Sequence, residues 1–214
     1  MIVISGYGQS SSVLSKGNWY KFSISATGVY KINAKFLKKL GINTKAIDPK
    51  NIKIFGNGGS MLPEKLSLRR FNDLKENSIY VKGEEDRSFD NDDYILFYGK
   101  GAHDWRIDIA AQKANHNQNI YSDKSYYFLT IDTTPGRRIQ ILEQPNQNSS
   151  KTFTYYDDYI FYEKELKNLF ALGRLWFGED LSFPNSQTFK IPFPNQVENS
   201  FINIKISAVV ISSL

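Results

Sequence analysis

Residues 51–64 read N-I-K-I-F-G-N-G-G-S-M-L-P-E. Ile52 and Ile54 alternate with polar residues, which predicts a short strand that runs directly into the glycine-rich residues 56–59. Glycine and asparagine adopt positive φ at little cost, so this run lets the backbone reverse tightly or approach another surface closely. A phosphate-binding loop would need a following helix and a Gly-Lys-Ser/Thr element, but Pro63 follows instead. We therefore interpret the run as a structural turn between strands.

The composition predicts a mainly β fold. The chain has 214 residues and is 41% hydrophobic and 14% aromatic, with 13 Tyr and 15 Phe. Large rings suit half-buried pleated surfaces, so we expect β-sandwich-like modules with one or two short helices. The net charge of +5 comes from basic pairs that are scattered rather than clustered on one face, which argues against nucleic-acid binding.

Other function classes are excluded by what the sequence lacks. There is no cysteine, so the chain has no disulfide, no thiolate metal site and no cysteine nucleophile. No run approaches the length of about 20 apolar residues that a transmembrane helix needs. The first residues, M-I-V-I-S-G-Y-G, lack the basic and apolar regions of a secretion signal, and residues 200–214 end in a strand pattern. We expect the chain to be a segment of a larger protein.

Composition shifts divide the chain into four parts. The Ser/Gly-rich residues 1–16 are predicted to be a linker or arm, and residues 17–143 a β-rich module. Residues 144–184 are predicted to connect this module to a second, truncated β-domain that starts at residues 185–214. The boundary rests on the linker composition Q-P-N-Q-N-S-S at residues 144–150.

Local patterns predict the elements of the first module. Residues 19–25 and 29–33 alternate in polarity around a short turn and are predicted to form a hairpin. Residues 34–40 are predicted to form a helix with Asn33 as N-cap and Gly41 just past its end. The remaining predicted strands of this module are residues 78–83, 93–99, 125–131 and 137–142. The apolar runs at 94–98 and 126–129 indicate central strands that are buried on both faces.

The second half of the chain has weaker patterns. A helix is predicted over residues 159–170 from the spacing of Leu166, Leu169 and Phe170. The apolar cluster at residues 175–179 is expected to be buried against other parts of the protein. The strand patterns at 187–192 and 201–211 are interpreted as the opening strands of the second β-domain.

The acidic run E-E-D-R-S-F-D-N-D-D at residues 84–93 has two interpretations. Calcium takes 6–8 oxygen ligands from flexible loops, and the candidate ligands here are Asp86, Asp90, Asp92 and Asp93. The order of residues does not fit an EF-hand, which requires a central glycine and a glutamate at the twelfth position. We favour a solvated turn in which Asp side chains accept local backbone N–H bonds.

The sequence contains two histidines, His103 in A-H-D-W and His116 in N-H-N-Q-N. Without cysteine, they cannot form a Cys/His pair or a zinc site with three or four ligands. His103 and Asp104 are adjacent, so on a strand their side chains would point to opposite faces. We expect both histidines to lie in loops as hydrogen-bonding residues, and we assign no catalytic residue and no cofactor.

Several ordered segments together resemble a known family. They are G-N-W-Y-K-F-S-I-S-A-T-G-V-Y-K-I at 17–32, F-L-K-K-L-G-I at 36–42, the run at 51–64, D-L-K-E-N-S-I-Y-V-K-G-E-E-D at 73–86, F-D-N-D-D-Y-I-L-F-Y-G-K-G at 89–101 and N-I-Y-S-D-K-S-Y-Y-F-L-T at 119–130. This order resembles the region ahead of the catalytic domain in the PorU-type, gingipain-like sortases of the Bacteroidota type IX secretion system. The resemblance covers residues 14–142 and continues more loosely to the end.

The resemblance implies a cell-surface or outer-membrane cysteine peptidase that removes sorting domains from secreted cargo. Its implied partners are a downstream peptidase domain of the same protein, outer-membrane secretion proteins and the cargo. The catalytic Cys and His of that family lie in the peptidase domain, so this segment is expected to be non-catalytic and to position that domain or contact partners. The alternative is a stand-alone carbohydrate- or adhesin-type binding module, for which a row of coplanar exposed aromatic rings is expected.

Overall fold

The computed structural model describes residues 11–111, 113–144, 148–169, 173 and 176–210. The chain divides into two compact units, Met1–Asn146 and Gln147–Leu214. Parts of several predicted segments lie outside the described residues, namely residues 1–10 of the arm, 145–147 of the linker, 170 of the second helix, 175 of the apolar cluster and 211–214 at the end of the last strand segment.

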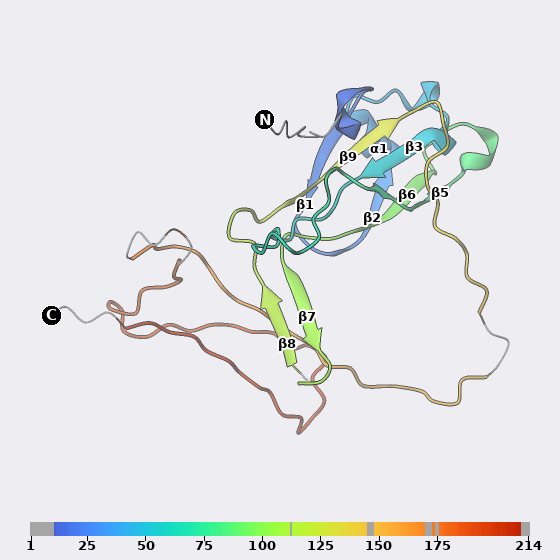
Figure 1. Ribbon diagram of the computed structural model, residues 1–214. Helices are drawn as coiled ribbons and strands as arrows, with labels where there is room; N and C mark the ends of the chain where they lie inside the picture. Colours follow the sequence, from blue (N-terminus) through green and yellow to red (C-terminus); the bar gives the residue numbers. More distant parts are fainter. Residues whose placement is uncertain (1–10, 112, 145–147, 170–172, 174–175, 211–214) are drawn as a thin grey trace, which may run out of the picture. The chain divides into compact units, whose positions relative to one another are not determined.

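The described residues of the first unit form three antiparallel sheets, which confirms the mainly β prediction (Figure 1). The first sheet has the order β1 (Tyr20–Ile24), β9 (Ser125–Ile131), β3 (Ile52–Phe55) and β4 (Glu76–Asn77). The second has the order β2 (Gly28–Asn33), β6 (Tyr94–Gly99) and β5 (Ile79–Lys82). The third is the hairpin of β7 (Asp104–Asp108) and β8 (Lys113–Asn117).

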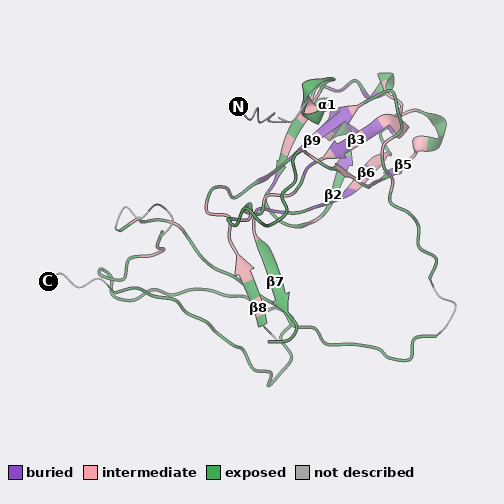
Figure 2. Ribbon diagram, viewed as in Figure 1, coloured by how far each residue is buried: buried purple, intermediate pink, exposed green. Residues whose placement is uncertain are grey.

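The first two sheets pack face to face through aromatic side chains. Phe97 of β6 contacts Phe22 of β1 and Tyr127 of β9, with ring centroids 5.6 and 5.3 Å apart. Figure 2 shows the buried residues gathered on these strands. The core is therefore that of a sandwich, in which one face of each sheet supplies the apolar side chains.

The predicted hairpin of residues 19–33 is wrong. β1 pairs with β9, whereas β2 pairs with β6, so the two strands belong to different sheets. The chain crosses from one layer of the sandwich to the other through the short turn between them. The alternating pattern is the same in a hairpin and in such a crossing, because both require one buried face per strand.

The predicted helix is confirmed as α1 (Ala34–Lys39). The Asn33 side chain accepts a hydrogen bond from the backbone N–H of Phe36 at 3.0 Å, and Gly41 follows the helix with a φ of +88°. Leu37 is fully buried, while Lys38 and Lys39 in the last turn are exposed, as the helix dipole favours. Short 3-10 turns complete the helical content of the described residues, at Val13–Ser15, Thr44–Ala46, Pro49–Asn51 and Glu84–Asp86.

β6 and β9 are central strands, as predicted, but they are not buried on both faces. Tyr98 of β6 and Tyr126 of β9 are exposed, because one face of each sheet meets the core and the other meets solvent. The strand predicted at 137–142 is also wrong: residue 138 makes only an isolated bridge to Ile79.

The elements predicted in the second unit do not form over its described residues. Residues 159–169 contain no helix, and Lys167 instead makes an antiparallel bridge with Phe177. Leu166 and Leu169 are exposed, and a short helix without a packed apolar stripe is marginal. Residues 187–192 and 201–210 are not strands, and Phe201, Ile204 and Ile206 are exposed. A strand needs a hydrogen-bonded neighbour and a surface that buries one of its faces.

Within the described residues, no helix is both long and apolar enough to cross a lipid bilayer.

Candidate functional site

The glycine-rich run acts through close packing. A Cβ added at Gly56 would lie 2.8 Å from Cε1 of Tyr127, and one added at Gly59 would lie 2.9 Å from the Cβ of Ser125. Gly58 has a φ of +86°, a conformation that favours glycine. The close approach allowed by the sequence is therefore confirmed, and protein atoms occupy the space beside the loop.

The run is not a tight turn between strands. β3 pairs with β4, so the chain needs all of the residues between Phe55 and Glu76 to return to the sheet. Asn57 holds the two ends together: its amide donates to the Asp73 carbonyl at 3.0 Å and its carbonyl accepts the Lys75 N–H at 2.9 Å. The Asn57 side chain thus extends the hydrogen bonding between the two chain segments beyond the ends of β3 and β4. A long surface loop connects the segments that it joins.

The four candidate calcium ligands lie in a turn that closes on itself. Asp86 accepts the N–H of Ser88 at 2.9 Å, and Asp93 accepts the N–H of Asp90 at 2.7 Å. Asp90 accepts the Ser88 hydroxyl at 3.2 Å, and Asp92 is exposed. The bonds of Asp86 and Asp93 are local side-chain-to-backbone bonds of the kind that the favoured interpretation describes, and the bond of Asp90 joins two side chains. The described residues contain no group of three or more His, Cys, Asp or Glu side chains that could hold a metal ion.

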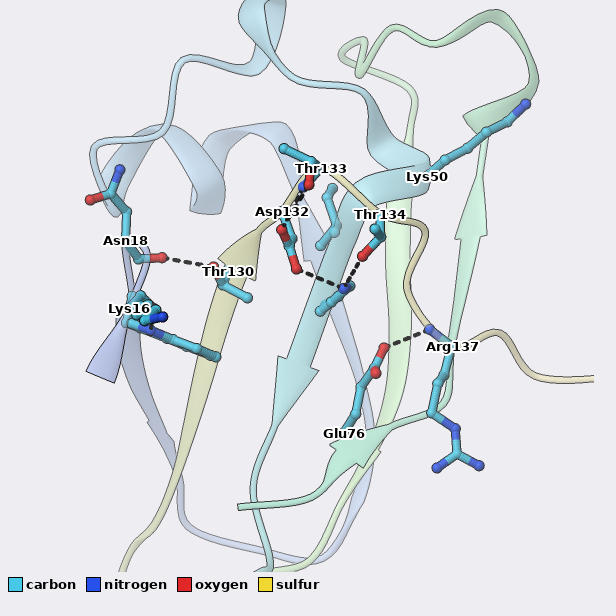
Figure 3. Close-up of polar contacts among 12 residues, drawn as sticks. Lys16, Asn18, Lys50, Glu76, Thr130, Asp132, Thr133, Thr134 and Arg137 are labelled. Carbon is cyan, nitrogen blue, oxygen red and sulfur yellow. Dashed lines mark hydrogen bonds and ion pairs between the residues drawn. The ribbon is translucent and has the colours of Figure 1, made fainter. Parts of the chain in front are cut away.

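A polar network joins the first sheet to the chain that follows β9. The Lys53 ammonium donates to Asp132 at 2.9 Å and to Thr134 at 2.7 Å. The hydrogen bond from Lys53 to Asp132 lowers the pKa of the Asp132 carboxyl. Figure 3 shows the contacts on either side of it: Thr130 donates to the Asn18 carbonyl, and the Arg137 N–H donates to Glu76. These bonds link neighbouring segments of the chain, so we interpret the network as structural.

Arg138 joins the segment that follows β9 to the 3-10 turns Pro49–Asn51 and Glu84–Asp86 by hydrogen bonds. Its guanidinium donates to the Glu84 carboxylate at 2.8 Å and to the carbonyls of Pro49 and Lys50 at 2.9 and 2.8 Å. A rigid fork of donors suits this arrangement of carbonyls.

The two histidines meet at the base of the β7–β8 hairpin. Their ring centroids are 5.8 Å apart, and the centroids of the His116 and Trp105 rings are 4.8 Å apart in an edge-to-face arrangement. His103 lies in a loop, as predicted, and its Nδ1 accepts the N–H of Asn119 at 3.3 Å. His116 lies on β8 instead, so the loop prediction is wrong for this residue. Cross-strand pairing with Trp105 decides its position.

The hairpin has one apolar and one polar face. Trp105 and Ile107 lie two residues apart on β7 and pair with His116 and Ala114 of β8. The other face carries Asp104, Arg106 and Asp108 paired with Asn117, Asn115 and Lys113. Every residue of β7 is exposed, and Ile107 is 65% exposed. Figure 2 shows β7 as an exposed ribbon away from the buried strands.

This exposed apolar face is the strongest candidate interaction surface. Ile107 is the more exposed of its two large apolar side chains, and a partner that covers this face would stabilise the two-stranded hairpin. Period-two alternation of Trp105 and Ile107 with charged residues could have predicted the hairpin from the sequence. The alternative of a flat aromatic platform gains no support here, because the Trp105 and His116 rings are inclined by 70°.

Comparison with solved structures finds a similar fold. No protein-family model matches the sequence, and no curated protein sequence matches it. The fold is similar to that of dimeric latent PorU from Porphyromonas gingivalis, with a TM-score of 0.66 and 28% sequence identity. The match covers 85% of this chain and 16% of the PorU chain. The chain thus resembles one region of PorU and spans a small part of its length.

Acidification is expected to weaken the hairpin. The pKa of His116 lies below its usual value of 6.5, because burial disfavours the imidazolium and His103 adds repulsion, while Asp104 opposes the shift. The unfolded hairpin therefore binds more protons than the folded hairpin. The stability that neutral His116 contributes is present above pH 6.5 and is lost as the pH falls through the lowered pKa of the folded state. Hydrogen exchange of residues 104–117, corrected for intrinsic rates, should rise on acidification. His116→Phe keeps a ring beside Trp105 and should flatten this dependence; greater protection at low pH would contradict the prediction.

Proposed function

We propose that this chain is a non-catalytic N-terminal region of a PorU-type, gingipain-like cysteine peptidase that acts as a sortase in type IX secretion. The observation that carries the proposal is the similarity to PorU, with 28% identity over 85% of this chain. The absence of cysteine from the sequence supports a non-catalytic role, because a cysteine peptidase needs a thiolate nucleophile. On this proposal the parent protein works at the cell surface or outer membrane.

In this role the region positions the peptidase domain and contacts partner proteins or cargo. The sandwich provides a rigid support, and the apolar face of the hairpin provides the contact. Trp105 is suited to this function, since aromatic side chains are enriched at the centres of protein interfaces, and Ile107 adds exposed apolar area to the same face. The mixed charges of the opposite face keep the hairpin soluble when it is uncovered.

The proposal is tested first on the gene. The reading frame downstream of residue 214 is expected to encode a domain with the Cys and His of a peptidase. A reading frame without such a domain would refute the proposal. Turnover of a peptide substrate by the 214-residue chain alone would refute the non-catalytic assignment.

The hairpin contact is tested with separately produced parts. The 214-residue chain should co-elute with the downstream part of its own protein, and Ile107→Ser should weaken this association about tenfold or more, as expected for an apolar residue at the centre of an interface. Val29→Ser is the matched control, because Val29 is an equally exposed β-branched residue on β2. Equal association of both variants would exclude the hairpin as the contact.

A further inference from the structure

The loop that follows Asn57 carries several large apolar side chains that are exposed to solvent. We define residues 58–75 as the 58–75 loop, which makes up most of the connection between β3 and β4. Its exposed apolar residues are Leu62, Leu66, Leu68 and Phe71, and Leu66 is 88% exposed. Four large exposed apolar side chains within ten residues are more than the single scattered ones that a protein surface ordinarily carries, and exposed apolar area of this kind is typical of a contact surface.

The loop has a defined shape despite its lack of secondary structure. Asp73 is fixed at its base by the Ser12 hydroxyl and the Val13 N–H, which donate to its carboxylate at 2.9 and 2.6 Å. Within the loop, the Arg70 guanidinium donates to the carbonyls of Pro63 and Glu64, and the Leu68 N–H donates to the Lys65 carbonyl at 3.1 Å. A surface loop with close ends and its own internal contacts is often functional.

Cations alternate with the apolar side chains. The loop has more cations than acidic residues: the cations are Lys65, Arg69, Arg70 and Lys75, and the acidic residues are Glu64 and Asp73. Asp73 is occupied by the contacts at the base, and Lys75 lies over the Phe71 ring at 4.7 Å. The outer part of the loop therefore combines leucines with an excess of positive charge.

We propose that the 58–75 loop docks on the surface of an anionic lipid bilayer. Leu66 and Leu68 would enter the boundary between headgroups and acyl chains, while Lys65 and Arg69 would remain beside the lipid phosphates. Each cation near such a surface strengthens binding. A protein partner fits less well. Lysine is depleted from the centres of protein interfaces and leucine is under-represented among their hot spots, and these two types outnumber arginine, which is enriched there, among Lys65, Leu66, Leu68 and Arg69. The hairpin differs in this respect: its charges alternate in sign and do not favour an anionic surface.

The test uses sedimentation of the 214-residue chain with vesicles. Phosphatidylcholine vesicles are compared with vesicles that also contain phosphatidylglycerol, and binding is expected only to the anionic ones. Lys65→Glu with Arg69→Glu should reduce partitioning about tenfold or more, since each cation contributes about a fivefold effect. Leu66→Ser with Leu68→Ser should cause a comparable loss.

Control variants separate the loop from the general charge and apolar content of the chain. Lys35→Glu with Lys39→Glu changes two exposed cations of α1, and Val29→Ser removes an exposed apolar residue of β2. Binding that is equal on neutral vesicles, or that falls equally in the control and loop variants, would overturn the proposal. Loop variants that change self-association without vesicles, and leave vesicle binding intact, would assign the loop to a second copy of the chain instead.

Discussion

Phe97→Ala is expected to lower the free energy of unfolding of the first unit by about 3–5 kcal/mol, the range for deletion of a buried phenylalanine ring. Phe97 is 1% exposed and lies on the central strand of the second sheet. Its ring contacts Phe22 and Tyr127 of the opposite sheet and Tyr30 of its own, at 5.3 to 5.7 Å. The substitution would leave a cavity between the two sheets, which central strands cannot close by moving.

Native-state hydrogen exchange of β6 and β9 amides measures this effect, because these amides report on unfolding of the first unit. Tyr98→Ala is the matched control: it removes the next aromatic side chain of the same strand, which is 54% exposed. The control should change stability far less. Equal effects of the two substitutions would show that the sheets are not held together through Phe97.

Gly56→Ala is expected to cost about 1–3 kcal/mol, the range for a side chain forced into a packed site. A Cβ there would overlap the Tyr127 ring, 2.8 Å from Cε1 and 3.1 Å from Cγ. Tyr127 cannot move aside easily, because its hydroxyl accepts the Lys100 N–H at 2.7 Å and donates to the Lys100 carbonyl at 3.1 Å. Burial also raises the pKa of this hydroxyl, which keeps it protonated as a donor.

Gly28→Ala is the control for Gly56→Ala, because nothing lies within 4 Å of a Cβ at Gly28. The same exchange measurement should show a large loss for Gly56→Ala and little change for Gly28→Ala. A Gly56→Ala variant as stable as the wild type would contradict the close packing of the loop on Tyr127. The Gly56 N–H also donates a hydrogen bond to the Lys75 carbonyl. Alanine keeps this N–H, so loss of that bond would not explain a loss of stability in Gly56→Ala.

The sequence predicted the elements whose causes are local. Helix α1 depends on the Asn33 cap, a short apolar stripe and Gly41, all within a few residues. The strands at 52–55, 79–82, 94–99 and 125–131 follow from alternating or continuous apolar patterns. The turn chemistry of residues 84–93 is also local, because Asp86, Asp90 and Asp93 each bond to a residue two or three positions away.

The candidate site was predicted less well. The hairpin at 104–117 carried a period-two signal, but its apolar face became apparent only once Trp105 was paired with His116. The proximity of the two histidines has no signal in the sequence, because it depends on a strand register. The exposed leucines of the 58–75 loop are ordinary in a sequence and become informative only when their exposure is known.

The run at residues 51–64 shows where this division lies. By itself the sequence determined that a strand ends at the glycines and that the backbone there can come close to another surface, because both follow from the properties of the residues themselves. Only the tertiary structure decided that the other surface is Tyr127 and Ser125 of β9, and that the chain returns to the sheet at Glu76. Pairing of strands far apart in the chain depends on the packing of the whole sandwich, which no local pattern encodes.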